Sequence, residues 1–166
     1  MALSINKAAA LAFACATLFQ GSAVAAEGGQ RMTREVYAAY LAAFNAGDDR
    51  YAEIYAPDVV FDHGPYGVLR GRQAILDFYR DIRTQLKERV TASEVVIGED
   101  QKVMAVELTT ELTAVRDGVK LPSRTEPLKK GETLITRGVV FYGLSDGRVV
   151  TIRGAVRGVT FVPAKP

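Results

Sequence analysis

His63 is the only histidine of the 166-residue chain, and it lies between a short apolar run and a Gly-Pro turn. The unperturbed pKa of histidine, about 6.5, is close to neutrality. At the mouth of a pocket its imidazole can therefore accept and return a proton, and such catalysis typically contributes about 10²–10⁴-fold to a rate. The alternative is a histidine in the core or at a pocket rim that hydrogen-bonds to the backbone. His63 is thus the first candidate for a catalytic base.

Tyr40 is the candidate for a hydrogen-bond donor beside such a base. Its hydroxyl can stabilise an enolate-like oxygen, which is usually the larger contribution to catalysis. Alternatively, it is a core tyrosine whose hydroxyl has a buried partner. Asp62 is a third candidate, but side chains alternate along a strand, so its carboxylate should point away from His63 unless a bulge redirects it. Four more aromatic residues are expected to line a pocket for an apolar ligand: Phe61, Tyr55, Tyr79 and Tyr142.

The N-terminal segment has the pattern of a secretory signal peptide. A short positively charged start precedes the apolar run 8–19, and small residues follow it. This pattern predicts a signal peptide over 1–26, followed by a flexible polar tail over 27–32. The apolar run is shorter than the roughly 20 residues that span a bilayer, so we expect no membrane anchor after cleavage. A periplasmic or secreted bacterial protein is therefore expected.

Composition excludes several kinds of function. Removal of the signal peptide leaves about 140 residues, an ordinary size for one domain, over 33–166. Cys15, the single cysteine, lies within the signal peptide, so the mature chain has no disulfide and no thiol nucleophile. One histidine also argues against a zinc site, and we expect neither a metal nor a cofactor. The net charge is +2 with scattered basic residues, so nucleic acid is not an expected partner.

The periodicity of apolar residues predicts an α+β fold. Helical spacing occurs first over 33–46, where Thr33 can cap the start and Gly47 the end. Three helices of the N-terminal half should cover the concave face of a curved antiparallel sheet. The predicted helices are 33–46, a short one before Pro57, and 73–88; the predicted strands are 59–63, 95–98, 102–116, 132–144 and 148–157, with 67–72 as a loop.

Four segments resemble a known family. They are 40–48, 55–61, 70–79 and 146–153, and together they span most of the predicted domain. They resemble the nuclear transport factor 2-like superfamily in its SnoaL-like (polyketide cyclase) and ketosteroid isomerase branch. The resemblance implies a cone-shaped α+β fold with an apolar pocket, and a homodimer formed through the outer face of the sheet.

The resemblance also implies roles for particular residues. Tyr40 occupies the position of a tyrosine that donates to the developing enolate, and His63 that of an aspartate base. The second donor of ketosteroid isomerases falls near Val139, which cannot donate. We therefore expect an exported SnoaL-like protein that binds an apolar small molecule, and that acts as an isomerase, dehydratase or cyclase by proton transfer on a carbonyl compound. The alternative is a non-catalytic periplasmic ligand-binding or interaction module.

Overall fold

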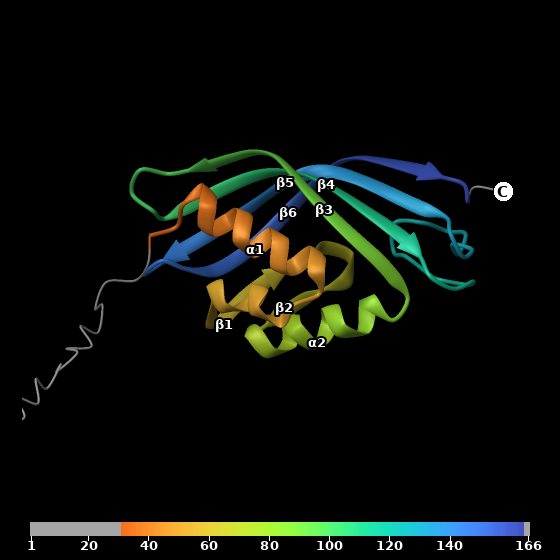
Figure 1. Ribbon diagram of the computed structural model, residues 1–166, viewed down its shortest axis with the longest axis horizontal. Helices are drawn as coiled ribbons and strands as arrows, with labels where there is room; N and C mark the ends of the chain where they lie inside the picture. The colour runs from red at the N-terminus through yellow and green to blue at the C-terminus, as the bar shows by residue number, and fades with distance from the viewer. Residues whose placement is uncertain (1–30, 165–166) are drawn as a thin grey trace, which may run out of the picture.

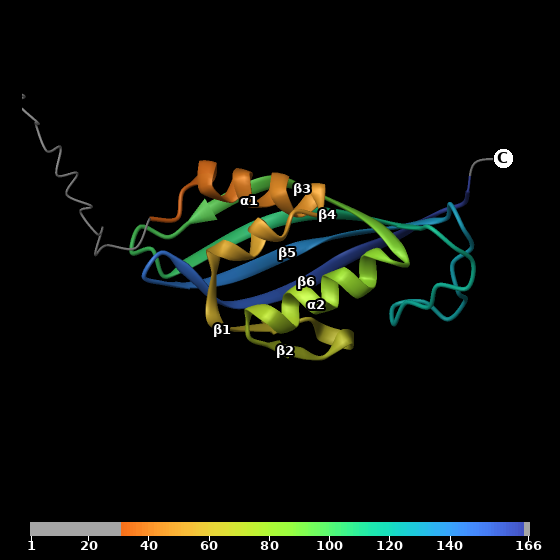
Figure 2. The same cartoon turned by 60° about the horizontal axis from the view of Figure 1, so that its bottom comes forward.

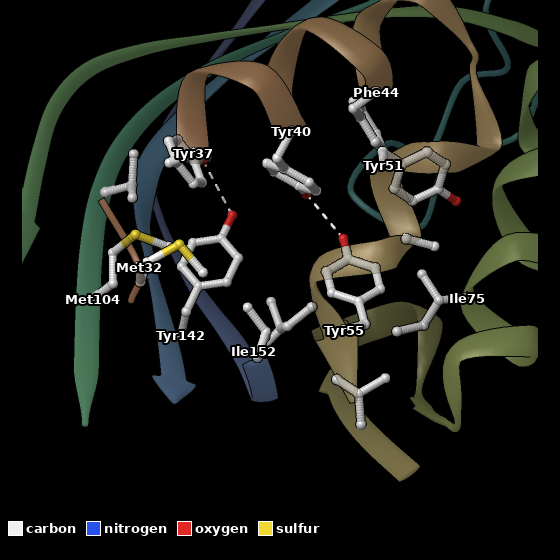
Figure 3. Close-up of a cluster of buried hydrophobic side chains, with 14 of the residues drawn as sticks. Met32, Tyr37, Tyr40, Phe44, Tyr51, Tyr55, Ile75, Met104, Tyr142 and Ile152 are labelled. Carbon is white, nitrogen blue, oxygen red and sulfur yellow. Dashed lines mark hydrogen bonds between the residues drawn. The ribbon is translucent and has the colours of Figure 1, made fainter. Parts of the chain in front are cut away.

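The computed structural model describes residues 31–164. The predicted signal peptide, 1–26, and most of the predicted tail lie outside this range. Met32 differs from the expectation of a flexible tail, because its side chain is 2% exposed and belongs to the main hydrophobic cluster. It lies beside Met104 in Figure 3. The folded domain therefore begins before its first helix.

The helices form where the sequence provides caps and an apolar face. Helix α1 spans Arg34–Ala46; the Thr33 hydroxyl accepts a hydrogen bond from the N–H of Val36. Gly47 ends α1 in the left-handed conformation, at φ 71°. A 3-10 helix, η1 (Asp49–Ile54), follows, and α2 spans Arg72–Arg83. A second short 3-10 helix, η2, covers Gly64–Tyr66. No helix in residues 31–164 is long and apolar enough to cross a membrane.

Six strands form one curved sheet, and the helices cover one of its faces (Figures 1 and 2). The predicted α+β architecture is therefore confirmed. One pairing differs from the expected antiparallel pattern: β1 runs parallel to β6, so the sheet is mixed. Parallel strands need a long connection, and here α2 and the four strands β2–β5 supply it. The strands are β1 (Tyr55–Asp62), β2 (Val68–Arg70), β3 (Leu86–Ile97), β4 (Val103–Ala114), β5 (Thr133–Ser145) and β6 (Arg148–Val162), in the order β2-β1-β6-β5-β4-β3.

The end of the third predicted helix was wrong. Helix α2 stops at Arg83, where the N–H groups of Thr84 and Gln85 turn back onto carbonyls of its last turn. Strand β3 then begins at Leu86, nine residues before the predicted strand start at Val95. The predicted loop 67–72 also contains the short strand β2. The segment after α2 therefore belongs to the sheet and not to a helix.

The core lies between the helices and the inner face of the sheet. Met104 and Val106 of β4 are fully buried there, in agreement with the predicted alternation of that strand. Asn45, near the end of α1, ties the helix to β3: its amide nitrogen donates to the carbonyl of Val90, and its amide oxygen accepts from the N–H of Val90, each at 2.8 Å. This double hydrogen bond fixes α1 relative to β3.

Candidate functional site

A cavity of about 440 Å³ lies between the helices and the sheet. Its walls come from α1, α2, η2, β1 and the inner faces of β3–β6, and they are mostly apolar and aromatic. Cavities of about 300–1,000 Å³ with this kind of lining are typical of small-molecule sites. Most of the residues proposed from the sequence lie on its wall: Tyr40, Tyr55, Phe61, His63, Tyr79 and Tyr142.

Four tyrosines that line this cavity pair through their hydroxyl groups (Figure 3). The hydroxyl oxygens of Tyr40 and Tyr55 lie 2.9 Å apart, and those of Tyr37 and Tyr142 lie 3.3 Å apart. A hydroxyl has a single hydrogen to donate, so one hydrogen bond within a pair leaves the other hydrogen free. Each pair can therefore offer one donor to a ligand oxygen while keeping its internal bond.

Burial keeps these hydroxyl groups protonated. It raises the pKa of Tyr40 well above the ordinary value for a tyrosine, and the neighbouring Tyr55 and Tyr37 raise it further. The pKa of Tyr55 and that of Tyr142 are also raised well above the ordinary value, again mainly by burial. At neutral pH the cluster consequently supplies hydrogen bonds and no proton acceptor of its own.

His63 lies in an aromatic wall. Its imidazole ring is 4.5 Å from the ring of Phe61, 4.8 Å from Tyr66, 5.1 Å from Phe78 and 6.4 Å from Tyr79, measured between ring centroids. Its backbone N–H donates to the carbonyl of Gly67. Burial lowers the pKa of the imidazole below the ordinary value for histidine. A neutral imidazole can accept a proton, so this environment is compatible with a general base.

Asp62 lies apart from this group. Its side chain is exposed, and its carboxylate accepts a hydrogen bond from the N–H of Gly64 at 3.1 Å, within the turn that follows β1. The alternation of β1 places Asp62 on the side opposite Phe61 and His63. Val139 also borders the cavity, on β5, and its side chain has no donor.

Glu88 is the residue of the cavity wall that the sequence did not point to. The predicted helix ran as far as residue 88, whereas in β3 the side chain of Glu88 faces inward between Leu86 and Val90. Burial raises the pKa of its carboxyl to about 7, although Arg83 acts in the opposite direction. Alternate residues of a strand share one face, so the apolar Leu86 and Val90 on either side of Glu88 were the sequence signal that could have placed Glu88 in the wall.

The described residues contain no cluster of three or more side chains of the kinds that hold a metal ion. The remaining polar groups of the cavity wall are few compared with the aromatic ones. They include Thr110, Thr136 and Ser123, together with the exposed Arg137. His63, Glu88 and the tyrosine hydroxyls can offer a bound molecule hydrogen bonds and proton transfer.

Comparison with known proteins places this geometry in a family. The model of the SnoaL-like domain matches residues 37–152, which is most of the described chain. The chain belongs to the SnoaL-like family. No curated protein shows a significant match to this SnoaL-like chain.

Solved structures share the fold of this SnoaL-like protein at low sequence identity. A protein described as a polyketide cyclase from Pseudomonas putida is 23% identical, with a TM-score of 0.60 over 73% of this chain and 88% of that one. The Δ5-3-ketosteroid isomerase from Mycobacterium sp. is 21% identical, with a TM-score of 0.58 over 77% and 96%. SalBIII, an epoxide hydrolase/cyclase-like enzyme of pyran ring formation in salinomycin, is 22% identical, with a TM-score of 0.56 over 74% and 88%. At these identities the likeness establishes the fold alone.

Proposed function

We propose that this SnoaL-like protein is a cofactor-independent isomerase, dehydratase or cyclase that transfers protons on an apolar carbonyl compound bound in the cavity. The observation that carries the proposal is the shared wall: the imidazole of His63 and the Tyr40–Tyr55 hydroxyl pair border one cavity. The cyclase and isomerase activities of structurally similar proteins are compatible with it.

In this mechanism His63 removes a proton from the carbon next to a carbonyl group. The electron pair of the C–H bond moves toward the carbonyl oxygen, which becomes an enolate. The free hydrogen of the Tyr40–Tyr55 pair is donated to that oxygen, where negative charge develops. When the proton on His63 is replaced by a hydrogen from the solvent, delivery of that hydrogen to the same carbon gives exchange. Delivery of a proton to another carbon gives isomerisation.

The test is α-proton exchange of benzylacetone in deuterated buffer, followed by NMR. We expect His63→Ala to lower the exchange rate by about 10²–10⁴-fold, because the general base is removed. The wild-type rate should also fall as the pH drops through the pKa of His63, since protonation leaves no base; burial places that fall below the ordinary histidine range. Asp62→Asn, which alters an exposed carboxylate beside His63, should leave the rate unchanged.

Equal exchange by the wild type and His63→Ala would remove His63 as the base. Benzylacetone that binds without any exchange would instead identify the protein as a ligand-binding module. The Asp62→Asn control removes the charge beside His63 but keeps an acceptor for the N–H of Gly64, so it separates loss of the imidazole from loss of a neighbouring charge.

We also propose that the protein is exported and forms a homodimer through the outer face of the sheet. The sequence pattern of 1–26 supports export. Exposed apolar side chains on β3, β4 and β5 support association: Val96 is 52% exposed, Val103 47% and Phe141 38%. After expression with the complete N terminus in a bacterium, we expect a periplasmic protein whose mass lacks the signal peptide and which sediments as a dimer. An uncleaved or monomeric protein would contradict the respective proposal.

A further inference from the structure

Glu88 is the single carboxylate in the wall of the cavity, among the residues that the structure describes. On the same face of β3 it is flanked by Leu86 and Val90, both of which are buried. Within residues 31–164 its carboxyl group makes neither a hydrogen bond nor an ion pair, and burial is the main influence upon it. Its side chain is half-buried in an apolar wall without a partner, which disfavours the ionised form of the carboxyl group.

The groups around Glu88 leave it available to a ligand. Arg83 is the nearby cation, but its guanidinium donates to the carbonyl of Phe44 at 2.9 Å and stacks over the ring of Tyr51 at 5.3 Å. The other titratable neighbours are the phenols of Tyr51, Tyr66 and Tyr79, which stay neutral because burial raises the pKa of each. Across the strand pair, β4 presents the apolar Leu112.

His63 and Glu88 lie on different walls of the same cavity. His63 follows β1, whereas Glu88 belongs to β3, and β6, β5 and β4 lie between these two strands in the sheet. Tyr66 links the two walls: its ring is 4.8 Å from that of His63, and it packs against the hydrophobic cluster that contains Leu86. A ligand in this cavity is therefore bordered by two proton-transfer groups that come from different elements.

We propose that Glu88 is the proton donor of this site, and that the reaction is the loss of water from an apolar β-hydroxy ketone. This inference rests on the proposed function and names one of its three reaction types. Exchange and simple isomerisation need only one group, which takes a proton from carbon and returns a hydrogen to carbon. Expulsion of a hydroxyl group needs, in addition, an acid at a different place in the cavity.

The step is balanced as follows. His63 takes the proton from the carbon between the carbonyl group and the carbinol carbon, and the electron pair of that bond forms the new C=C bond. The C–O bond of the carbinol breaks, and its electron pair leaves with the oxygen, which receives the proton of Glu88 and departs as water. His63 ends protonated and Glu88 ionised, and proton exchange with water restores both. Since burial raises the pKa of Glu88 to about 7, the acid form is available at neutral pH.

The experiment compares two reactions in the same protein. One is dehydration of the β-hydroxy ketone that yields benzylideneacetone, followed by its ultraviolet absorbance; the other is the α-proton exchange of benzylacetone. We expect Glu88→Gln to lower dehydration by about 10²-fold or more and to lower exchange far less, because only dehydration needs the acid. His63→Gln should lower both. Glu94→Gln, at an exposed carboxylate on the same strand, should lower neither.

The wild-type pH profile is a second test that needs no variant. The rate of dehydration should fall as the pH rises through about 7, because Glu88 then loses the proton that it donates. Exchange should show no such fall. Glu88→Gln should abolish the fall in any activity that remains.

In Glu88→Gln, an equal loss of both reactions would overturn the inference, and so would an unchanged dehydration rate. A wild-type protein that exchanges the α-protons of benzylacetone but forms no benzylideneacetone would also overturn it. In each of these cases the proposed proton transfer by His63 stands. A wild-type protein that exchanges no proton overturns the proposed function itself, and the inference with it.

Discussion

Tyr40→Phe is expected to lower the rate of ketone proton exchange by about 10²–10³-fold, the usual effect of removing one donor to a developing oxyanion. The hydroxyl of Tyr40 shares its hydrogen bond with Tyr55 alone, so one hydrogen of this pair is free for a ligand. Without the Tyr40 hydroxyl, the enolate oxygen loses one of the two hydroxyl groups of this pair, and only that of Tyr55 remains. The measurement is the NMR exchange of benzylacetone, with substrate binding determined separately.

Tyr55→Phe identifies which member of the pair meets the ligand. If Tyr40 donates to the enolate and Tyr55 only supports Tyr40, then Tyr55→Phe should lower the exchange rate less than Tyr40→Phe does. The opposite order would assign the contact to Tyr55. Tyr51→Phe is the matched control, because the buried hydroxyl of Tyr51 has no hydrogen-bond partner in the described chain and its loss should cost neither stability nor exchange. Full activity in Tyr40→Phe and Tyr55→Phe would show that the pair plays no part in catalysis.

Phe44→Ala is expected to lower the free energy of unfolding by about 3–5 kcal/mol, which is typical of truncating a buried aromatic side chain. Phe44 is 5% exposed, and its ring meets those of Tyr79 at 4.9 Å and Tyr51 at 5.2 Å, both edge-on. The guanidinium of Arg83 lies 5.1 Å from its centroid. One truncation therefore removes packing between α1, η1 and α2 at once.

The measurement for Phe44→Ala is urea denaturation followed by circular dichroism. Phe44→Leu is the control, because it keeps most of the volume and should cost less than about 1.5 kcal/mol if the surrounding side chains repack. A similar loss in both variants would show that the aromatic geometry matters more than the volume. An unchanged free energy of unfolding in Phe44→Ala would show that this ring does not stabilise the core.

Local signals in the sequence were sufficient to predict most of the helices, strands and turns. Thr33 and Gly47 mark the two ends of α1, and Asp146 and Gly147 mark the turn between β5 and β6. Each of these signals acts within a few residues of the backbone that it shapes. The caps and turns were therefore predictable from the sequence without knowledge of the tertiary structure.

The other features of the fold and of the site depend on contacts between residues that are far apart in the sequence. The parallel pairing of β1 with β6 joins two segments that no local pattern relates. Leu86 fits the helical spacing of α2 and the alternation of β3 equally well, so the sequence did not show where the helix ends. Glu88 was consequently assigned to the helix end and missed as a site residue. The pairing of Tyr40 with Tyr55 also requires that α1 and β1 be brought together.

The double hydrogen bond of Asn45 has a consequence beyond holding α1 in place. Strand β3 is at the margin of the sheet, where free N–H and C=O groups can recruit a strand of another molecule. Asn45 occupies both backbone groups of Val90 there, and a bulge between Ala92 and Glu94 interrupts the regular margin further along. Asn45 thereby hinders the pairing of a further strand with β3, and it also orients α1 over the cavity.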